Sequence, residues 1–458
     1  MPRPDWSRLR PGVALVGPLA MLASVLVGWL AFAGASGEEG SVAVGLFVGA
    51  GAIVLMAWSF MLAVRLRLLE PFFGGLDRAY QAHRWAGTLA VLLMFLHVRL
   101  EPEIDGGIPG ASRAVAESAE GLAGVAEYVI YGLVALSLLR WIPYRWWRWT
   151  HKALGVPFAF ACWHFFTAEK PYANGSPWGW YFGTAMVLGI GAYLWRVVGR
   201  DAIWRGRAHT VVGAEVEGTT LDLRLAPRGR RLRFRPGQFA VLKVQERGLS
   251  EPHPFTIASA PGDDQLRFLI RDLGDWTDRL QRAELAGARV IVEGPYGRFR
   301  PLPQGDRPVI WVAGGVGITP FLSAIADLPP RPRPQRPTLL YCVPTRQGAT
   351  AMADVERAAL EGRIELVVVA SGEGRRFSPS LLAEVAGDRL RGAHVAVCGP
   401  TGLVRSAAAA ARAQGAAEVE TEAFDFRSGI GPDLSVPLAE LIDPEAAPTA
   451  PVGTATLP

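Results

Sequence analysis

Cysteine is scarce in this sequence, and the few cysteines lie far apart. The chain of 458 residues has three, Cys162, Cys342 and Cys398, and no two of them form a CxxC motif. This argues against a disulfide framework and against an iron–sulfur cluster, which needs four ligands that are mostly thiolates. Lysine is also rare, because nearly all basic residues are arginine, and the net charge of +5 is not gathered into one dense patch. That distribution gives little support to nucleic acid binding.

Apolar residues, in contrast, are abundant. Half of the chain is hydrophobic, the mean hydropathy is +0.21 and there are 15 tryptophans. Apolar runs of roughly membrane-spanning length lie at 13–33, 42–63, 81–98, 122–139, 152–167 and 178–198. The first run lacks a clear small-residue cleavage site and is interpreted as a retained helix, not a signal peptide. We therefore expect a six-helix transmembrane bundle over residues 1–200.

The charges of the loops predict how this bundle lies in the membrane. Basic residues fall in alternate segments: Arg3, Arg8, Arg10; Arg65, Arg67, Arg78, Arg84; Arg140, Arg145, Arg148, Lys152; Arg196, Arg200, Arg205. The intervening loops are acidic or neutral: Glu38, Glu39; Glu101, Glu103, Asp105, Glu117, Glu120. Because cytoplasmic loops carry the excess of Lys and Arg, we expect a multi-pass protein of the cell inner (plasma) membrane with both termini in the cytoplasm.

After Arg200 the pattern changes to short runs separated by glycine and proline. Residues 208–303 contain short, β-rich, turn-bounded segments, which predict a small antiparallel barrel. Residues 304–427 alternate between strand and helix patterns, which predicts a parallel, doubly wound α/β sheet. Residues 428–458 are rich in proline and alanine with little to bury, and we expect a disordered tail.

Four of the seven histidines lie in the apolar half as two pairs. His83 and His97 are 14 residues apart, which is about 21 Å along a helix with both side chains within roughly 40° of one face. His151 and His164 are 13 apart, on a segment that runs in the same direction. His83 would then oppose His151 at one depth, and His97 would oppose His164 at the other. Two opposed imidazoles at each depth suit two b-type haems with bis-His ligation.

Two features of the histidine pattern need explanation. A spacing of 13 rotates His164 off the face of His151 on a straight helix, so we expect Gly155 and Pro157 to distort the helix and restore the alignment. The simpler interpretation is four unrelated polar residues in a bundle. Two matched pairs argue against it, because each uncompensated polar group is penalised in lipid.

The second half carries nucleotide-binding patterns. HPFTIAS at 253–259 ends a strand and can present a hydroxyl and backbone amides to a phosphate, and GDWT at 274–277 opens a helix whose N-terminus favours anions. AGGVGITP at 313–320 joins a strand to a helix, where glycines permit a tight turn and close approach of a pyrophosphate. Cys398 closes a strand at the sheet's carboxyl edge, either beside a nicotinamide or as a small buried hydrophobe.

With these motifs, residues 40 to 427 resemble the ferric reductase and NADPH oxidase superfamily, in its single-polypeptide bacterial form. The resemblance implies a bis-haem domain, a flavin-binding barrel and a ferredoxin-reductase-like nucleotide domain, with FAD, two haem b and NADPH (or NADH) as cofactors. The implied haem ligands are His83, His97, His151 and His164. The implied FAD and nucleotide contacts are His253, Pro254, Phe255, Thr256, Ile257, Gly274, Trp276, Thr277, Gly314, Gly315, Gly317, Thr319, Pro320, Arg346, Gly399 and Pro400, with Cys398 by the nicotinamide.

The sequence departs from the family pattern in three places. The family usually ends on an aromatic residue that shields the flavin, whereas here Phe424 or Phe426 would do so internally, before some thirty further residues. Superoxide-forming oxidases of the family tend to carry an arginine in the second helix and a histidine one turn after the outer haem ligand. Here the outer part of the second helix has no basic residue, and Glu101 lies one turn after His97, which puts oxygen specificity in doubt. A 2′-phosphate could pair with Arg346, or with Arg375 and Arg376, and this possibility slightly favours NADPH over NADH.

The sequence as a whole predicts a transmembrane oxidoreductase that passes electrons from cytoplasmic NAD(P)H through FAD and two haems to an outside acceptor. That acceptor is either molecular oxygen or ferric iron, and the expected partners are the lipid bilayer and this small acceptor, without an obligatory subunit. Two alternatives stay open: a haem-containing membrane redox sensor, and a membrane flavin reductase without haem.

Overall fold

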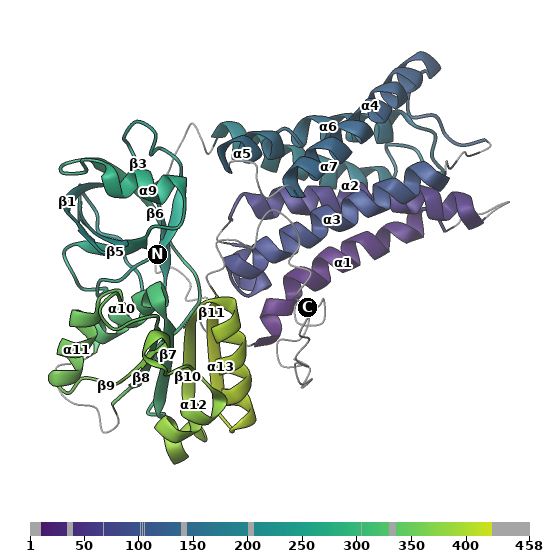
Figure 1. Ribbon diagram of the computed structural model, residues 1–458. Coiled ribbons are helices and arrows are strands. Elements are labelled where there is room, and N and C mark those ends of the chain that lie inside the picture. Colours follow the sequence, from purple (N-terminus) through teal and green to yellow (C-terminus); the bar gives the residue numbers. More distant parts are fainter. Residues whose placement is uncertain are drawn as a thin grey trace, which may run out of the picture. The chain divides into compact units, whose positions relative to one another are not determined.

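The computed structural model of this protein (Figure 1) describes residues 11–33, 40–66, 68–100, 102, 104, 106–138, 144–199, 206–303, 305–328 and 336–423. The chain divides into two compact units, one helical unit before residue 205 and one α/β unit from 205 to 427. This division falls where the sequence changes from long apolar runs to short alternating ones.

The helical unit contains α1 (Val16–Gly28), α2 (Gly40–Ala63), α3 (Leu76–Leu100), α4 (Arg113–Leu138), α5 (Tyr144–Lys152), α6 (Gly155–Thr167) and α7 (Pro177–Leu194). Each of the six predicted apolar runs is mainly helical over its described residues. Within the described residues, four stretches are long and apolar enough to cross a membrane: Val13–Ala31, Gly40–Ala63, Arg113–Ser137 and Pro177–Gly199. The protein is therefore a membrane protein, whereas the count of six spans stays a prediction.

Helix α2 forms the centre of the helical unit because its small residues let neighbouring helices approach. Ala50 and Ala57 are buried, and a Cβ on Gly51 would lie 3.3 Å from both Leu93 of α3 and Val25 of α1. The Trp58 indole donates a hydrogen bond of 2.9 Å to the Ser24 hydroxyl, which satisfies a polar group inside the bundle. Close packing on α2 thereby fixes where α3 places its histidines.

The helix that carries the second histidine pair is interrupted, as the sequence predicted. Helix α5 ends at Lys152 and α6 begins at Gly155, with a turn at residues 153–154. A Cβ on Gly155 would lie 2.2 Å from the Tyr193 ring of α7, so glycine allows this close crossing. Pro157 lies in the first turn of α6, where a missing N–H leaves no helical hydrogen bond unmade.

The first sheet of the α/β unit is antiparallel and, over the described residues, has the strand order β4-β3-β6-β1-β2-β5. Its strands are β1 (Arg207–Glu217), β2 (Thr220–Pro227), β3 (Phe239–Val244), β4 (His253–Thr256), β5 (Leu266–Arg271) and β6 (Arg289–Tyr296), and α9 (Asp275–Arg282) packs beside them. An isolated bridge between Ile257 and Phe268 links the segment after β4 to β5. Antiparallel pairing is confirmed, but one bridge does not establish a closed barrel, which stays a prediction.

The second sheet is parallel, with the order β11-β10-β7-β8-β9 in the described part of the chain. Its strands are β7 (Val309–Gly314), β8 (Thr338–Val343), β9 (Glu365–Ala370), β10 (His394–Gly399) and β11 (Glu418–Ala423). Helices α10 (Thr319–Asp327) and α11 (Met352–Leu360) cover one face, and α12 (Pro379–Ala386) and α13 (Thr401–Ala413) cover the other. The predicted doubly wound arrangement is confirmed. The predicted tail, residues 428–458, lies outside the described residues.

Candidate functional site

The structure brings His83 of α3 and His151 of α5 together. Their ring centroids are 6.1 Å apart and the ring planes are inclined by 80°. Imidazole nitrogen–metal bonds are about 2 Å long, so two imidazoles that share one metal ion have centroids about 6 Å apart. The pair therefore has the separation that axial ligation of one iron requires. The Trp147 ring stacks on the His151 ring with 5.1 Å between centroids.

His97 lies near the other end of α3, and His164 lies near the end of α6, the helix that follows α5. His164, near the end of α6, is within electrostatic range of His97 near the end of α3. A Cβ on Gly49 would lie 2.6 Å from Nδ1 of His97, so the imidazole packs against the bare backbone of α2. The Nδ1 atom of His164 is buried and has no hydrogen-bond partner among the described residues.

Helix α2 orients both histidines of α3. Nδ1 of His83 is 2.8 Å from the Ser59 carbonyl oxygen, and Nδ1 of His97 is 2.9 Å from the Gly45 carbonyl oxygen. A carbonyl only accepts, so each Nδ1 donates and each Nε2 is left with its lone pair for a metal. The acceptors are 59 − 45 = 14 residues apart, which equals the spacing 97 − 83 = 14 of the histidines.

This donor set fits a haem. A bis-His haem needs only two protein ligands, because the porphyrin supplies the others, and a metal held by protein alone needs more. Within the described residues no group of three or more His, Cys, Asp or Glu side chains could hold a metal ion. The paired imidazoles, of which His83 and His97 have their Nδ1 atoms bound to a carbonyl, are thus suited to haem and not to a protein-only metal site.

The HPFT segment forms β4 and packs against α9. The Trp276 ring lies 4.1 Å from the His253 ring and 5.9 Å from the Phe255 ring, between centroids, while Pro254 is exposed. Thr256 and Ile257 are buried, and the Thr256 hydroxyl has no hydrogen-bond partner among the described residues. A buried unpaired hydroxyl costs about 1–3 kcal/mol. A bound FAD that supplied an acceptor or donor would remove this cost, so the site fits the cofactor.

Thr277 has a structural role that the motif alone did not reveal. Its hydroxyl oxygen accepts hydrogen bonds from the backbone N–H groups of Leu273 at 2.9 Å and Gly274 at 3.0 Å. These bonds close the turn that begins α9. The predicted contact of Gly274 and Thr277 with FAD stays a prediction.

The glycine loop joins β7 to α10 as predicted. Gly315 has a φ of +54°, in the left-handed region that favours glycine. A Cβ on Gly317 would lie 2.4 Å from the Cys398 carbonyl oxygen, and one on Gly314 would lie 2.7 Å from Pro400. Thr319 and Pro320 are buried in the first turn of α10. Strands β7 and β10 are neighbours, so the loop and residues 398–400 meet at one carboxyl edge of the sheet.

Cys398 is a buried thiol at that edge, next to Gly399. Burial raises its pKa well above the usual range, and the nearby Glu422 carboxylate raises it further. A raised pKa keeps the thiol neutral at neutral pH, which disfavours the thiolate needed for nucleophilic attack. Phe424 and Phe426, the two candidates for shielding the flavin, lie outside the described residues.

Arg346 follows β8, as predicted, and its side chain is more than half exposed. It forms an ion pair of 2.6 Å with Glu356. A 2′-phosphate would have to compete with this carboxylate, so a role in NADPH selection stays a prediction.

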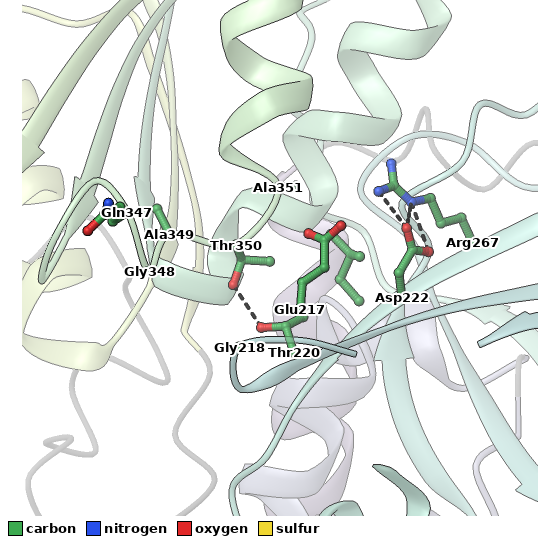
Figure 2. A pocket seen from close by; sticks show the side chains of 11 residues that line it. Glu217, Gly218, Thr220, Asp222, Arg267, Gln347, Gly348, Ala349, Thr350 and Ala351 are labelled. Atoms are coloured by element: carbon green, nitrogen blue, oxygen red, sulfur yellow. Dashed lines mark hydrogen bonds and ion pairs between the residues drawn. The ribbon is translucent and has the colours of Figure 1, made fainter. Parts of the chain in front are cut away.

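The α/β unit contains a cavity of about 130 Å³ (Figure 2). It lies between the β1–β2 turn, β5 and the loop before α11, and Arg267, Asp222 and Thr350 are among its walls. None of the motif residues lines it. Nothing in the sequence indicated this cavity or the Ser59 and Gly45 acceptors, although the small residues of α2 are consistent with close helix approach.

Three family models match the chain in succession. Residues 48–162 match the ferric reductase like transmembrane component, residues 208–300 match an FAD-binding domain, and residues 311–409 match an oxidoreductase NAD-binding domain. The first match contains three of the four paired histidines and ends just before His164. The second contains HPFT and GDWT, and the third contains the glycine loop and Cys398.

Curated relatives match parts of the chain. Respiratory burst oxidase homolog protein E of Arabidopsis thaliana is 32% identical over 120 residues, which cover 21% of this chain and 13% of that protein. Methane monooxygenase component C of Methylosinus trichosporium is 37% identical over 118 residues (25% and 34%), and NADPH oxidase 3 of Rattus norvegicus is 29% identical over 173 residues (36% and 28%).

The matches thus span about a third or less of the length of these relatives. The order of the three matched domains agrees with the order of the helical unit, the antiparallel sheet and the parallel sheet. The chain belongs to the ferric reductase and NADPH oxidase superfamily.

Proposed function

We propose that this protein is a transmembrane flavocytochrome oxidoreductase that moves electrons from cytoplasmic NAD(P)H to an acceptor outside the cell inner membrane. We further propose that six spans carry two haem b groups and that both termini are cytoplasmic. When bound, FAD accepts a hydride from the nicotinamide and releases single electrons, and the haems relay them across the bilayer.

The observation that carries this proposal is that the two imidazoles of α3 and the two α2 carbonyls that accept from them have the same spacing. His83 with His151, and His97 with His164, would each hold one haem iron at one of two depths. The carbonyls of Ser59 and Gly45 keep Nε2 of His83 and His97 as the ligand atom. A packing role alone would not require the same tautomer and the same spacing at both depths.

The α/β unit would orient the flavin and the nicotinamide dinucleotide. The Thr256 hydroxyl and the Phe255 ring, supported by Trp276, would hold the flavin. Gly315 and Gly317 let the dinucleotide phosphates approach the backbone. The neutral Cys398 packs at the nicotinamide end without adding charge beside the hydride.

The acceptor is a one-electron acceptor, either oxygen or ferric iron. The named oxidase relatives favour oxygen, whereas the transmembrane domain matches the ferric reductase like component. No proton donor is required at the outer end if the acceptor takes only electrons. Reduction of cytochrome c that superoxide dismutase abolishes identifies oxygen, and an iron-dependent rate insensitive to dismutase identifies ferric iron.

The test uses purified protein loaded with haem and FAD. We expect sharp low-spin bands after dithionite reduction, two haems per chain, and NADPH-driven reduction of both. His97→Ala should lose one haem and reduction of the outside acceptor, but it should keep NADPH–ferricyanide activity, which needs only flavin.

Two results would contradict the proposal. Absence of porphyrin from otherwise cofactor-replete protein would support the flavin reductase, and bound haem without sustained NADPH consumption would support the redox sensor.

A further inference from the structure

Lys170 is a buried cation at the end of the helix that carries His164. It lies in the loop between α6 and α7, and only 3% of the residue is exposed. Its ammonium donates hydrogen bonds to the backbone carbonyls of Phe165 at 2.7 Å, Phe166 at 3.3 Å and Ala168 at 2.8 Å. It also lies 5.3 Å from the centroid of the Phe165 ring.

All three donors of this ammonium are used by the chain itself. An ammonium has three N–H groups and no acceptor, and three carbonyls occupy them. Lys170 therefore has no donor left with which to bind an anionic acceptor. No acidic side chain among the described residues forms an ion pair with it, and its charge lies among carbonyl dipoles at a helix C-terminus and beside the Phe165 ring, both of which favour a cation.

Two loops hold Lys170 in this position. Its backbone pairs with Ile108 in an isolated antiparallel bridge, with N···O distances of 2.8 and 3.2 Å. The Asn174 amide donates a hydrogen bond of 2.9 Å to the Phe166 carbonyl oxygen, which Lys170 also contacts. A Cβ on Gly110 would lie 2.0 Å from that same oxygen. The end of α6 is thus closed by the α3–α4 loop as well as by its own.

The charge of Lys170 lies close to His164, because its ammonium binds the carbonyls of the next two residues, Phe165 and Phe166. Lys170 is one of the groups within electrostatic range of His164, and the other is His97. Burial lowers the pKa of Lys170 to about 8, so the side chain is still mostly protonated at neutral pH. A buried charge is screened by salt much less than an exposed one.

We propose that Lys170 is a positioning residue of the outer haem site, which anchors the end of α6 and holds a fixed positive charge that raises the reduction potential of that haem. The inference rests on the proposed function, because it assigns His97 and His164 to a haem. A reduced haem carries one more electron than an oxidised one, so a nearby cation stabilises the reduced form. Electrons arriving from the inner haem would then move downhill to the outer one.

The test is a spectroscopic redox titration of the full protein in detergent, with haem content measured first. His97→Ala, which keeps only the inner haem, assigns the two potentials. We expect Lys170→Gln, whose amide keeps two donors but no charge, to lower the outer potential and leave the inner one at its wild-type value. Lys170→Arg, which keeps the charge, should stay close to wild type.

Several results would overturn the inference. These are unchanged potentials in Lys170→Gln, equal shifts of both haems, or loss of the outer haem from Lys170→Gln and Lys170→Arg alike, which would make Lys170 a structural cap only. A wild-type protein without two haems would instead refute the proposed function before any variant is measured.

Discussion

Thr256 buries a hydroxyl group that the described residues leave without a hydrogen bond. It is buried at the end of β4, and among the described residues it has no hydrogen-bond partner. Natural proteins rarely bury such a group without a reason. A flavin that hydrogen-bonds this hydroxyl would provide the reason, since the unmet group would be satisfied only in the complex.

Thr256→Val tests this explanation directly. The substitution removes the hydroxyl and keeps the shape, so the apoprotein should be as stable as wild type or more stable. FAD affinity should fall about fivefold to tenfold, which corresponds to one hydrogen bond of about 1 kcal/mol. Flavin fluorescence titration measures the affinity. Thr256→Ser is the matched control and should bind FAD almost normally, and wild-type affinity in Thr256→Val would rule the contact out.

At the scale of helices, the contact of α2 with α3 decides where the outer imidazole lies. His97 packs on Gly49 and donates to the carbonyl of Gly45, four residues earlier in α2. Any side chain at Gly49 would occupy the space of the imidazole, because a Cβ there would be 2.6 Å from Nδ1 and 2.8 Å from Cε1.

Gly49→Ala should therefore displace His97 and reduce the haem content from two per chain to one. Gly121→Ala is the control, because a Cβ at Gly121 of α4 has no atom within 4 Å and alanine favours the helix. Pyridine haemochrome absorbance counts the haems in each purified variant. If Gly49→Ala retained both haems with unchanged spectra, the outer haem could not depend on this packing.

The elements were predictable where their signal is local. Hydropathy indicated the helices, turn residues indicated the strands, and Gly155 with Pro157 indicated the break in the helix between His151 and His164. The acceptors for His83 and His97 were not predictable, because Ser59 and Gly45 lie 24 and 52 residues away in sequence and become neighbours only through tertiary packing. The closure of α6 by Lys170 likewise depends on a loop pairing with Ile108 that no periodicity encodes.

At the scale of the α/β unit, one ionic cluster joins the flavin-binding sheet to the nucleotide-binding sheet. Arg267 of β5 contacts Asp222 of β2 at 2.8 Å and Asp354 of α11 at 2.7 Å. Burial acts to lower the pKa of Arg267, but hydrogen bonds to the two carboxylates outweigh it and the pKa is raised. Hydride transfer needs the flavin and nicotinamide held in one geometry. The cluster is suited to hold it, beside the cavity shown in Figure 2.

Arg267→Met should therefore loosen the two sheets. It leaves Asp222 and Asp354 without their shared cation, and because these side chains are partly exposed we expect a loss of about 2 kcal/mol, below the range for a fully buried pair. For a unit of this size that lowers the temperature of flavin release by about 4–8 °C.

Arg357→Met is the matched control, because the only ion pair of Arg357 in the described structure is with Asp354. Its side chain is 65% exposed, and exposed pairs contribute about 0–1 kcal/mol. Equal shifts in the two variants would show that the cluster does not hold the sheets together, whereas a large shift in Arg267→Met alone, with slower flavin reduction by NADPH, would show that the same ions stabilise the unit and align its reactants.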